Sequence, residues 1–177
     1  MKICYVAEAG KRLAGSELSL INLIEELQLS GIEPYVVCHK DWELLEYFRS
    51  RNIPTKVIRS RISSCSRRWY IYGAFHILGG MIRFYNHLQI RKAARYLHEN
   101  HIELVHINTM LASDIWAAAA RSIGIPYILH LREFMDADHG RLFWNQEDVN
   151  SELLESSAVI AISDAVKHYW NERYGIC

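Results

Sequence analysis

The chain has 177 residues, half of them apolar and 23% charged, a composition that argues against a disordered or fibrous protein and suits one domain with a full hydrophobic core. No apolar run reaches the ~18 residues of a membrane-spanning helix and no signal-peptide pattern opens the chain, so we expect a cytoplasmic protein. The net charge is zero, but residues 59–95 contain eight basic residues and no acidic one, so that this segment carries +8 and the remainder −8.

Strand and helix signals alternate along the whole chain. Short apolar runs predict six strands, at residues 2–8, 33–39, 53–58, 103–108, 125–133 and 158–163. Periodic apolar residues predict helices between and after them, at residues 15–30, 41–51, 69–101, 112–124, 147–157 and 163–175. The segments 60–68 and 134–147 have neither pattern, and we expect them to be irregular.

The ends of several helices carry recognisable residues. Gly31 and Gly175 suit the C-terminal ends of the first and last helices. Asp41 and Ser163 are predicted N-caps, because their side-chain oxygens can accept from free backbone N–H groups. The long helix is expected to be interrupted near residues 79–80, where two glycines follow each other.

The predicted strands are almost continuously apolar, which is typical of strands covered by helices on both faces. Alternating strands and helices imply right-handed crossovers, and hence an α/β fold with a Rossmann-like, doubly wound parallel sheet. Cys4 and Cys38 fall inside strands, where a thiol behaves as a small buried hydrophobe. Because the cysteines are far apart and form no CxxC pair, neither a disulfide framework nor a zinc site is expected.

In such sheets ligands bind beyond the carboxyl ends of the strands. This rule selects the segments 8–17, 106–109 and 130–133, together with Ser163. It gives the location of a crevice and does not identify the ligand.

The first of these segments contains a turn with very little side chain, at Gly15 and Ser16. Either residue can open the following helix, whose free N–H groups and positive dipole end would form an anion site. In the alternative interpretation, Gly15 only makes a tight turn and Ser16 only caps the helix. The segment is not a GxGxxG motif, so a dinucleotide site is poorly supported.

Polar residues also lie at the ends of the fourth and fifth predicted strands. His130 could orient or deprotonate a substrate hydroxyl, or it could be a strand-end histidine bonded to backbone groups. Arg132 and Glu133 could bind substrate or pair with each other. Asn108, on the same side of its strand as His106, could bind a ligand or initiate a turn.

A basic and aromatic insert, at about residues 59–98, invites two interpretations. As a membrane-surface element, it would place Trp69 and Tyr70 in the interface while Arg67 and Arg68 meet anionic lipid. As a structural element, it would pack its aromatic side chains on the sheet and expose its arginines. Nucleic acid is not expected as a partner, because no binding module is recognisable.

Three segments together resemble the glycosyltransferase group 1, or family 4, enzymes. "AGSELSLINLIEELQLSGIEPYVVCH" is similar to their first turn and helix, which typically carry Gly-Gly-x-Glu. "VHINTMLASDIWAAAARSIGIPYILHLRE" resembles their block with an Ala-rich helix and a strand that ends in histidine, and "VIAISDAVKHYW" resembles the end of their N-terminal domain. The resemblance spans nearly all of the chain except residues 59–95.

The resemblance implies one half of a GT-B fold, in which two Rossmann-like domains face each other across a cleft. It further implies a nucleotide-sugar donor, a glycan or lipid-linked acceptor, retention of configuration, and no metal or other cofactor. By position, Gly15 and Ser16 would approach the donor diphosphate, and His130 would be the cleft histidine with a catalytic role. Asn108, Arg132 and Glu133 would bind the acceptor or substrate.

Two features depart from the family pattern. Ala14 stands where the first glycine is usual, and the donor-binding domain with its paired glutamates is absent from this sequence. We therefore expect an acceptor-side domain that is inactive alone and that serves cell-surface polysaccharide or glycolipid assembly. The alternatives are a GT-B sugar-nucleotide epimerase, which would need no acceptor, and a non-catalytic subunit that recruits an enzyme to the membrane.

Overall fold

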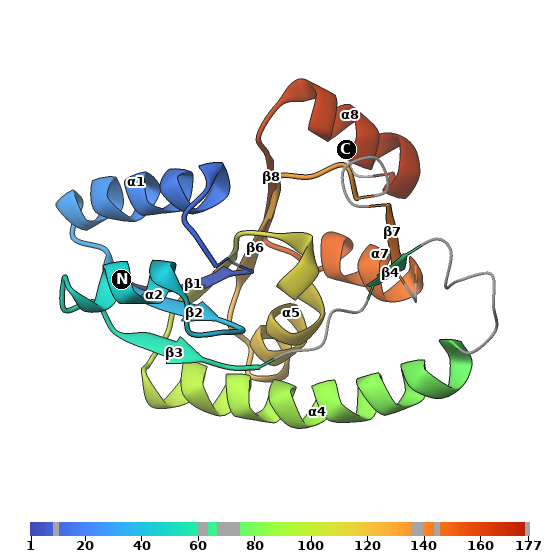
Figure 1. Ribbon diagram of the computed structural model, residues 1–177, viewed down its shortest axis with the longest axis horizontal. Helices are drawn as coiled ribbons and strands as arrows, with labels where there is room; N and C mark the ends of the chain where they lie inside the picture. The colour runs from blue at the N-terminus through green and yellow to red at the C-terminus, as the bar shows by residue number, and fades with distance from the viewer. Residues whose placement is uncertain (9–10, 60–63, 67–74, 136–139, 144–145, 176–177) are drawn as a thin grey trace.

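The computed structural model describes residues 1–8, 11–59, 64–66, 75–135, 140–143 and 146–175. Its centre is a six-stranded sheet in which all strands are parallel, in the order β3-β2-β1-β5-β6-β8 (Figure 1). The strands are β1 (Lys2–Ala7), β2 (Glu33–Cys38), β3 (Thr55–Val57), β5 (Leu104–Ile107), β6 (Tyr127–Leu131) and β8 (Ala158–Ala161). The six predicted strands and the doubly wound α/β architecture are confirmed.

Helices cover both faces of this sheet. The first face packs with α1 (Gly15–Leu29) and α2 (Glu43–Arg49). The other face packs with α4 (Phe75–Glu99), α5 (Ser113–Ser122), α7 (Gln146–Leu154) and α8 (Asp164–Tyr174). In Figure 1 α1 lies above the sheet and α4 below it.

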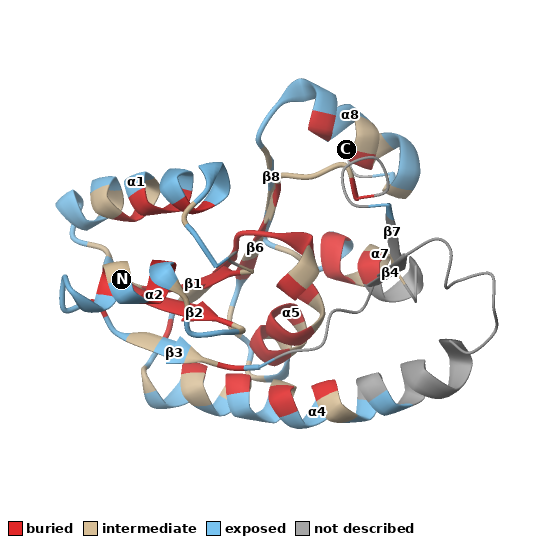
Figure 2. Ribbon diagram, in the orientation of Figure 1, coloured by how far each residue is buried: buried red, intermediate tan, exposed pale blue. Residues whose placement is uncertain are grey.

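The core is divided by the sheet into two apolar clusters, as the alternation of side chains along each strand requires. On β1, Tyr5 belongs to the cluster under α1, whereas Cys4 and Val6 belong to the cluster over α4 and α5. All three are almost completely buried, which explains the near-continuous apolar sequence of the strand. Figure 2 shows this buried centre and the exposed outward side of α4.

The expected interruption of the long helix is wrong. α4 continues through Gly79 and Gly80 as one helix of 25 residues. A glycine inside a helix costs only about 1 kcal/mol relative to alanine, because the helix hydrogen bonds remain intact. Tertiary packing offsets this cost, since Ala93 and Leu97 are fully buried against the sheet.

One predicted helix cap is wrong and three helix ends are confirmed. Asp41 does not cap α2, whose N-cap is Trp42; its carboxylate instead forms an ion pair with Arg49, at 2.6 Å. Ser163 does cap α8, since its Oγ accepts from the N–H of Val166 at 3.2 Å. The two predicted terminal glycines have left-handed backbones, with φ of 80° at Gly31 and 65° at Gly175.

Two short strands lie in segments that we expected to be irregular. β4 (Ser64–Ser66) and β7 (Arg141–Phe143) pair in antiparallel fashion, and Cys65 is opposite Leu142. The pair joins the insert to the segment that follows β6. The two strands are far apart in the sequence, so no local sequence pattern predicts their pairing.

Candidate functional site

The carboxyl edge of β1, β5 and β6 forms the candidate site. The chain leaves β1 toward β2 on one side and leaves β5 toward β6 on the other, so the strand order reverses between β1 and β5. Asn108, immediately after β5, is fixed at this edge because its backbone N–H donates to the carbonyl of Val6 at 2.8 Å. The start of α1 and the residues that follow β6 face the same edge.

Arg132 connects the side chains at this edge. Its Nε–H donates to the Oδ1 of Asn108 at 3.0 Å. Its Nη2 lies 3.4 Å from the Oγ of Ser19, on α1, and 3.4 Å from the Nδ1 of His130. We call Asn108, His130, Arg132, His106 and Ser19 the edge cluster. The structure thus brings together three residues that the sequence predicted separately.

His130 forms a pair with His106. The Nε2 of His106 is 3.3 Å from the Nδ1 of His130, and the two rings are stacked with centroids 5.5 Å apart. A guanidinium can only donate, so the Nδ1 of His130 accepts and its proton resides on Nε2. With that tautomer, the single lone pair of the His130 Nδ1 is shared between Arg132 and the Nε2–H of His106.

The electrostatics of the cluster agree with neutral rings. Burial and, to a smaller extent, the positive charge of Arg132 lower the pKa of His106 to about 4. Burial, Arg132 and the neighbouring His106 likewise lower the pKa of His130 to about 4. Burial also lowers the pKa of Arg132, against the opposing effect of Glu133 and Glu17. His130 therefore presents an N–H donor, which favours orienting a substrate over deprotonating it.

The first turn of α1 is open but holds a carboxylate of its own. Ala14 is the N-cap and Gly15 the first helical residue, so Ser16 does not cap the helix. The carboxylate of Glu17, only 5% exposed, accepts from the N–H of Ala14 at 3.0 Å and from the hydroxyl of Ser16 at 2.9 Å. A Cβ added to Gly15 would meet nothing within 4 Å. Internal packing therefore does not require a glycine there.

Glu133 lies beside the edge cluster and holds two segments together. Its Oε1 accepts from the hydroxyl of Thr109 at 2.9 Å, and its backbone carbonyl accepts from the indole N–H of Trp170 at 2.9 Å. Thr109 also caps the short helix η1 (Met110–Ala112). Arg132 donates to Asn108 and Glu133 accepts from Thr109, so each of these two neighbouring side chains has a hydrogen-bond partner other than the other one.

Ser19 was not singled out from the sequence, because it joins the site through a contact that spans 113 residues, for which the sequence contains no signal. His106 and Thr109 lie in the segment 106–109 that the strand-end rule selected, but no ligand role was assigned to either. The two-residue spacing between His106 and Asn108 places both on one side of their strand. The predicted membrane residues Arg67, Arg68, Trp69 and Tyr70 lie outside the part of the chain that the structure describes.

Neither a metal centre nor a membrane-crossing segment emerges from the described residues. Among them, no three His, Cys, Asp or Glu side chains gather in a way that could bind a metal ion. Within the same residues, no helix combines the length and the apolar character needed to cross a bilayer.

Solved structures with the same architecture are numerous, although no curated protein sequence matches the chain. Anabaena HepE, in complex with UDP and glucose, is 21% identical, with a TM-score of 0.67 over 98% of this chain and 41% of its own. Acinetobacter baumannii MurG is 16% identical, with a TM-score of 0.62 over 92% of this chain and 41% of its own. At such identities the likeness shows the GT-B-type fold.

The chain spans about two fifths of the length of these structures. The same holds for the lipopolysaccharide outer core galactosyltransferase WaaB, which is 17% identical, with a TM-score of 0.61 over 98% of this chain and 42% of its own. The sequence pattern that defines Glycosyltransferase Family 4 matches residues 13–177, almost the entire chain. The chain belongs to this family.

Proposed function

We propose that the chain is the acceptor-side domain of a retaining, nucleotide-sugar-dependent glycosyltransferase of hexosyltransferase type. Its family supports glycosyl transfer, and the complexes of HepE with UDP and UDP-glucose support a nucleotide-sugar donor. The structural neighbours are more than twice as long, so we infer that a second domain completes the cleft. The chain alone is then inactive.

The observation that carries this proposal is the edge cluster beside the open turn of α1. His130 offers a neutral N–H donor to a sugar hydroxyl, and Arg132 fixes its ring from the Nδ1 side. Gly15 leaves room for a diphosphate at the helix N-terminus. In this proposal Arg132 and the helix N–H groups meet the negative charge of the diphosphate, and no metal cofactor takes part.

The acceptor is proposed to be a glycan or a lipid-linked glycan of the cell surface. WaaB, one of the structural neighbours, is a lipopolysaccharide outer core galactosyltransferase, which supports this class of acceptor. An acceptor held in a membrane requires the domain to work at the membrane surface. The residues proposed for that contact include Arg67, Arg68, Trp69 and Tyr70.

The test is glycosyl transfer by the full-length protein, with radiolabelled UDP-sugars and glycolipid extracts. We expect His130→Gln to lower kcat/KM by about 100-fold, as removal of one positioned donor does. His168→Gln is the control, because that histidine is exposed on α8 and pairs with the exposed Glu172. Unchanged transfer by His130→Gln would contradict the role of His130.

A sugar-nucleotide epimerase is the second candidate function. UDP-GlcNAc 2-epimerase of Methanocaldococcus jannaschii shares the fold, with a TM-score of 0.54 over 100% of this chain. An epimerase converts its nucleotide-sugar without an acceptor, so NMR of the donor incubated with full-length protein alone distinguishes the two. Failure of both reactions in the full-length protein would instead favour the non-catalytic, membrane-recruiting subunit.

A further inference from the structure

The solvent-facing side of α4 carries large apolar side chains. Met81 is 67% exposed, Phe84 is 70% exposed and Leu88 is 43% exposed. Their spacings of three and four residues place them on one face of the helix, opposite the face buried on the sheet. We call these three residues the apolar stripe. Single exposed apolar residues are ordinary, but a row along one helix indicates contact with an apolar environment.

Cations continue the same face toward the end of the helix. Arg91, Lys92 and Arg95 are exposed and follow the apolar stripe at helical spacing. Within the described part of the chain, no carboxylate lies within ion-pair distance of them. A surface that presents exposed apolar side chains next to exposed cations can contact both the apolar interface and the charged headgroups of an anionic membrane.

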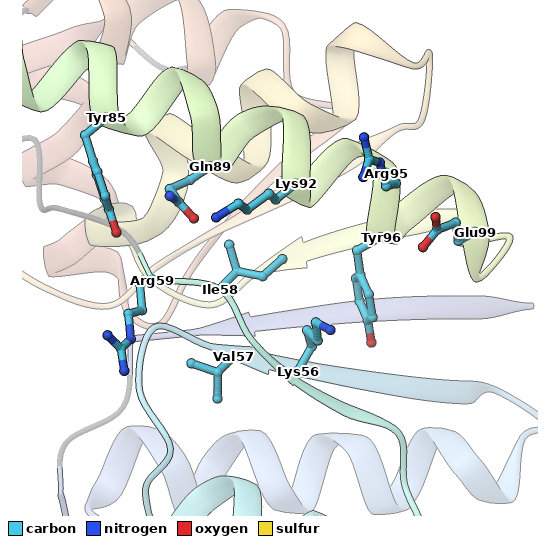
Figure 3. Close-up of a pocket in the computed structure, with 10 residues that line it drawn as sticks. All are labelled: Lys56, Val57, Ile58, Arg59, Tyr85, Gln89, Lys92, Arg95, Tyr96 and Glu99. Carbon is cyan, nitrogen blue, oxygen red and sulfur yellow. The ribbon is translucent and has the colours of Figure 1, made fainter.

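A groove between α4 and β3 adds further cations. It has a volume of about 710 Å³, and Lys56 and Arg59 line one wall while Lys92 and Arg95 line the other. Figure 3 shows the groove residues of α4 above and those of β3 and the residues that follow it below. Tyr85 and Tyr96, both half-buried, add phenol groups to the wall formed by α4. Glu99 is the one acidic residue among those that line the groove.

The direction of α4 relates this surface to the edge cluster. The helix leads from the carboxyl end of β3 back to the amino end of β5, so it runs antiparallel to the strands. Its first half, which carries the apolar stripe, therefore lies toward the carboxyl edge of the sheet. The stripe faces away from the sheet on the α4 side, whereas Arg132 reaches Ser19 on α1, so the stripe and the edge cluster lie toward the same end of the molecule but on opposite faces of the sheet.

We propose that the outward face of α4 and the adjoining groove bind an anionic phospholipid bilayer. The apolar stripe enters the interface, and the cations of the groove bind headgroup phosphates. The proposal rests on the proposed function only for its purpose, which is to hold the domain next to a lipid-linked acceptor. A surface with four groove cations and one acid has the charge that anionic lipid requires.

Co-sedimentation of the chain with vesicles tests the proposal. Vesicles of phosphatidylglycerol and phosphatidylcholine in equal parts should bind it, and vesicles of phosphatidylcholine alone should not. The double variant Lys92→Gln/Arg95→Gln should bind about 25-fold more weakly, because each cation near such a surface contributes roughly fivefold. Lys167→Gln/Arg173→Gln is the matched control, with the same change of charge on exposed cations of α8, at the opposite side of the molecule in Figure 1.

A triple variant separates the two parts of the surface. Met81→Ser/Phe84→Ser/Leu88→Ser should lose the binding that remains at high salt, because the apolar contact is not screened. Circular dichroism and thermal unfolding of each variant show that a loss of binding is not a loss of fold.

Three results would overturn the proposal. These are equal binding to both kinds of vesicle, equal loss in the matched control, and release of the chain from vesicles by millimolar inorganic phosphate, which would make the groove a site for free phosphate. Vesicle binding needs no sugar transfer. A failure here therefore leaves the proposed transferase standing, and a failed transfer assay leaves this surface standing.

Discussion

The edge cluster and the groove beside α4 both contain several nitrogen donors, but these donors differ in burial and in their partners. Arg132 is half-buried and lies within hydrogen-bond distance of Asn108, His130 and Ser19. Lys92 and Arg95 are exposed and have no carboxylate partner among the described residues. A buried charge needs fixed partners, whereas an exposed one is satisfied by water until a ligand arrives. The first arrangement suits positioning of one substrate, and the second suits many equivalent anions.

Removal of Arg132 should have the largest effect. Arg132→Ala leaves Asn108 and His130 without their shared donor, so we expect kcat/KM of the full-length protein to fall about 100-fold. The free energy of unfolding should fall by about 1–3 kcal/mol. Arg121→Ala is the control, because Arg121 pairs at 3.1 Å with the exposed Glu155, a contact worth less than about 1 kcal/mol. Equal effects of the two variants would show that the cluster has no special role.

The pH dependence of stability should reveal the histidine pair. Both pKa values near 4 in the folded state lie below the ordinary value of 6.5, so the unfolded chain binds more protons between them. This stability is fully present above pH 6.5 and is lost as the pH falls toward 4. Each histidine changes the free energy of unfolding by at most about 1.4 kcal/mol per pH unit, and solvent screening narrows the pH window over which the half-buried His130 does so. His106→Gln/His130→Gln should flatten the curve from chemical denaturation, whereas His168→Gln should not.

Gly15→Ala should separate folding from ligand binding. An alanine at the first position of α1 meets no neighbour and should raise the free energy of unfolding by up to about 1 kcal/mol. If the donor diphosphate approaches this turn, the added methyl should weaken donor binding about tenfold in calorimetry. Gly124→Ala should do the reverse, because its φ of 71° strains any side chain while the site stays intact. Unchanged donor binding by Gly15→Ala would remove the turn from the site.

The groove cations should matter least for stability. Lys92→Gln/Arg95→Gln should change the free energy of unfolding by no more than about 0.5 kcal/mol, since neither side chain has a carboxylate partner within the described ranges that it would lose. Thermal unfolding measures this directly. A loss comparable with that of Arg132→Ala would mean that the groove cations are structural, and the contrast between the two regions would disappear.

The sequence predicts the sheet better than it predicts the site. β1 and β2 are apolar on both faces, so their near-continuous apolar sequences are enough to predict both strands. The antiparallel pair of β4 and β7 joins Ser64 to Phe143, and nothing local encodes that contact. The continuity of α4 depends on packing that outweighs the cost of Gly79 and Gly80.

In the site too, the residues at strand ends could be predicted from the sequence, and the long-range contacts could not. Asn108 and His130 could be selected because each ends a predicted strand, where parallel sheets bind ligands. The hydrogen bond between Arg132 and Ser19 spans 113 residues, so only the folded chain brings the two together. The protonation of His130 follows from that same arrangement and could not be assigned from its position in the sequence.

The carboxylate of Glu17 gives the turn at α1 a resident anion. In the proposed function, a nucleoside diphosphate at this turn would compete with Glu17 for the N–H of Ala14 and the hydroxyl of Ser16, and it would gain only the difference between two bound anions. The same carboxylate would then take the place of the nucleoside diphosphate that transfer leaves behind. On that proposal we expect Glu17 to limit product inhibition.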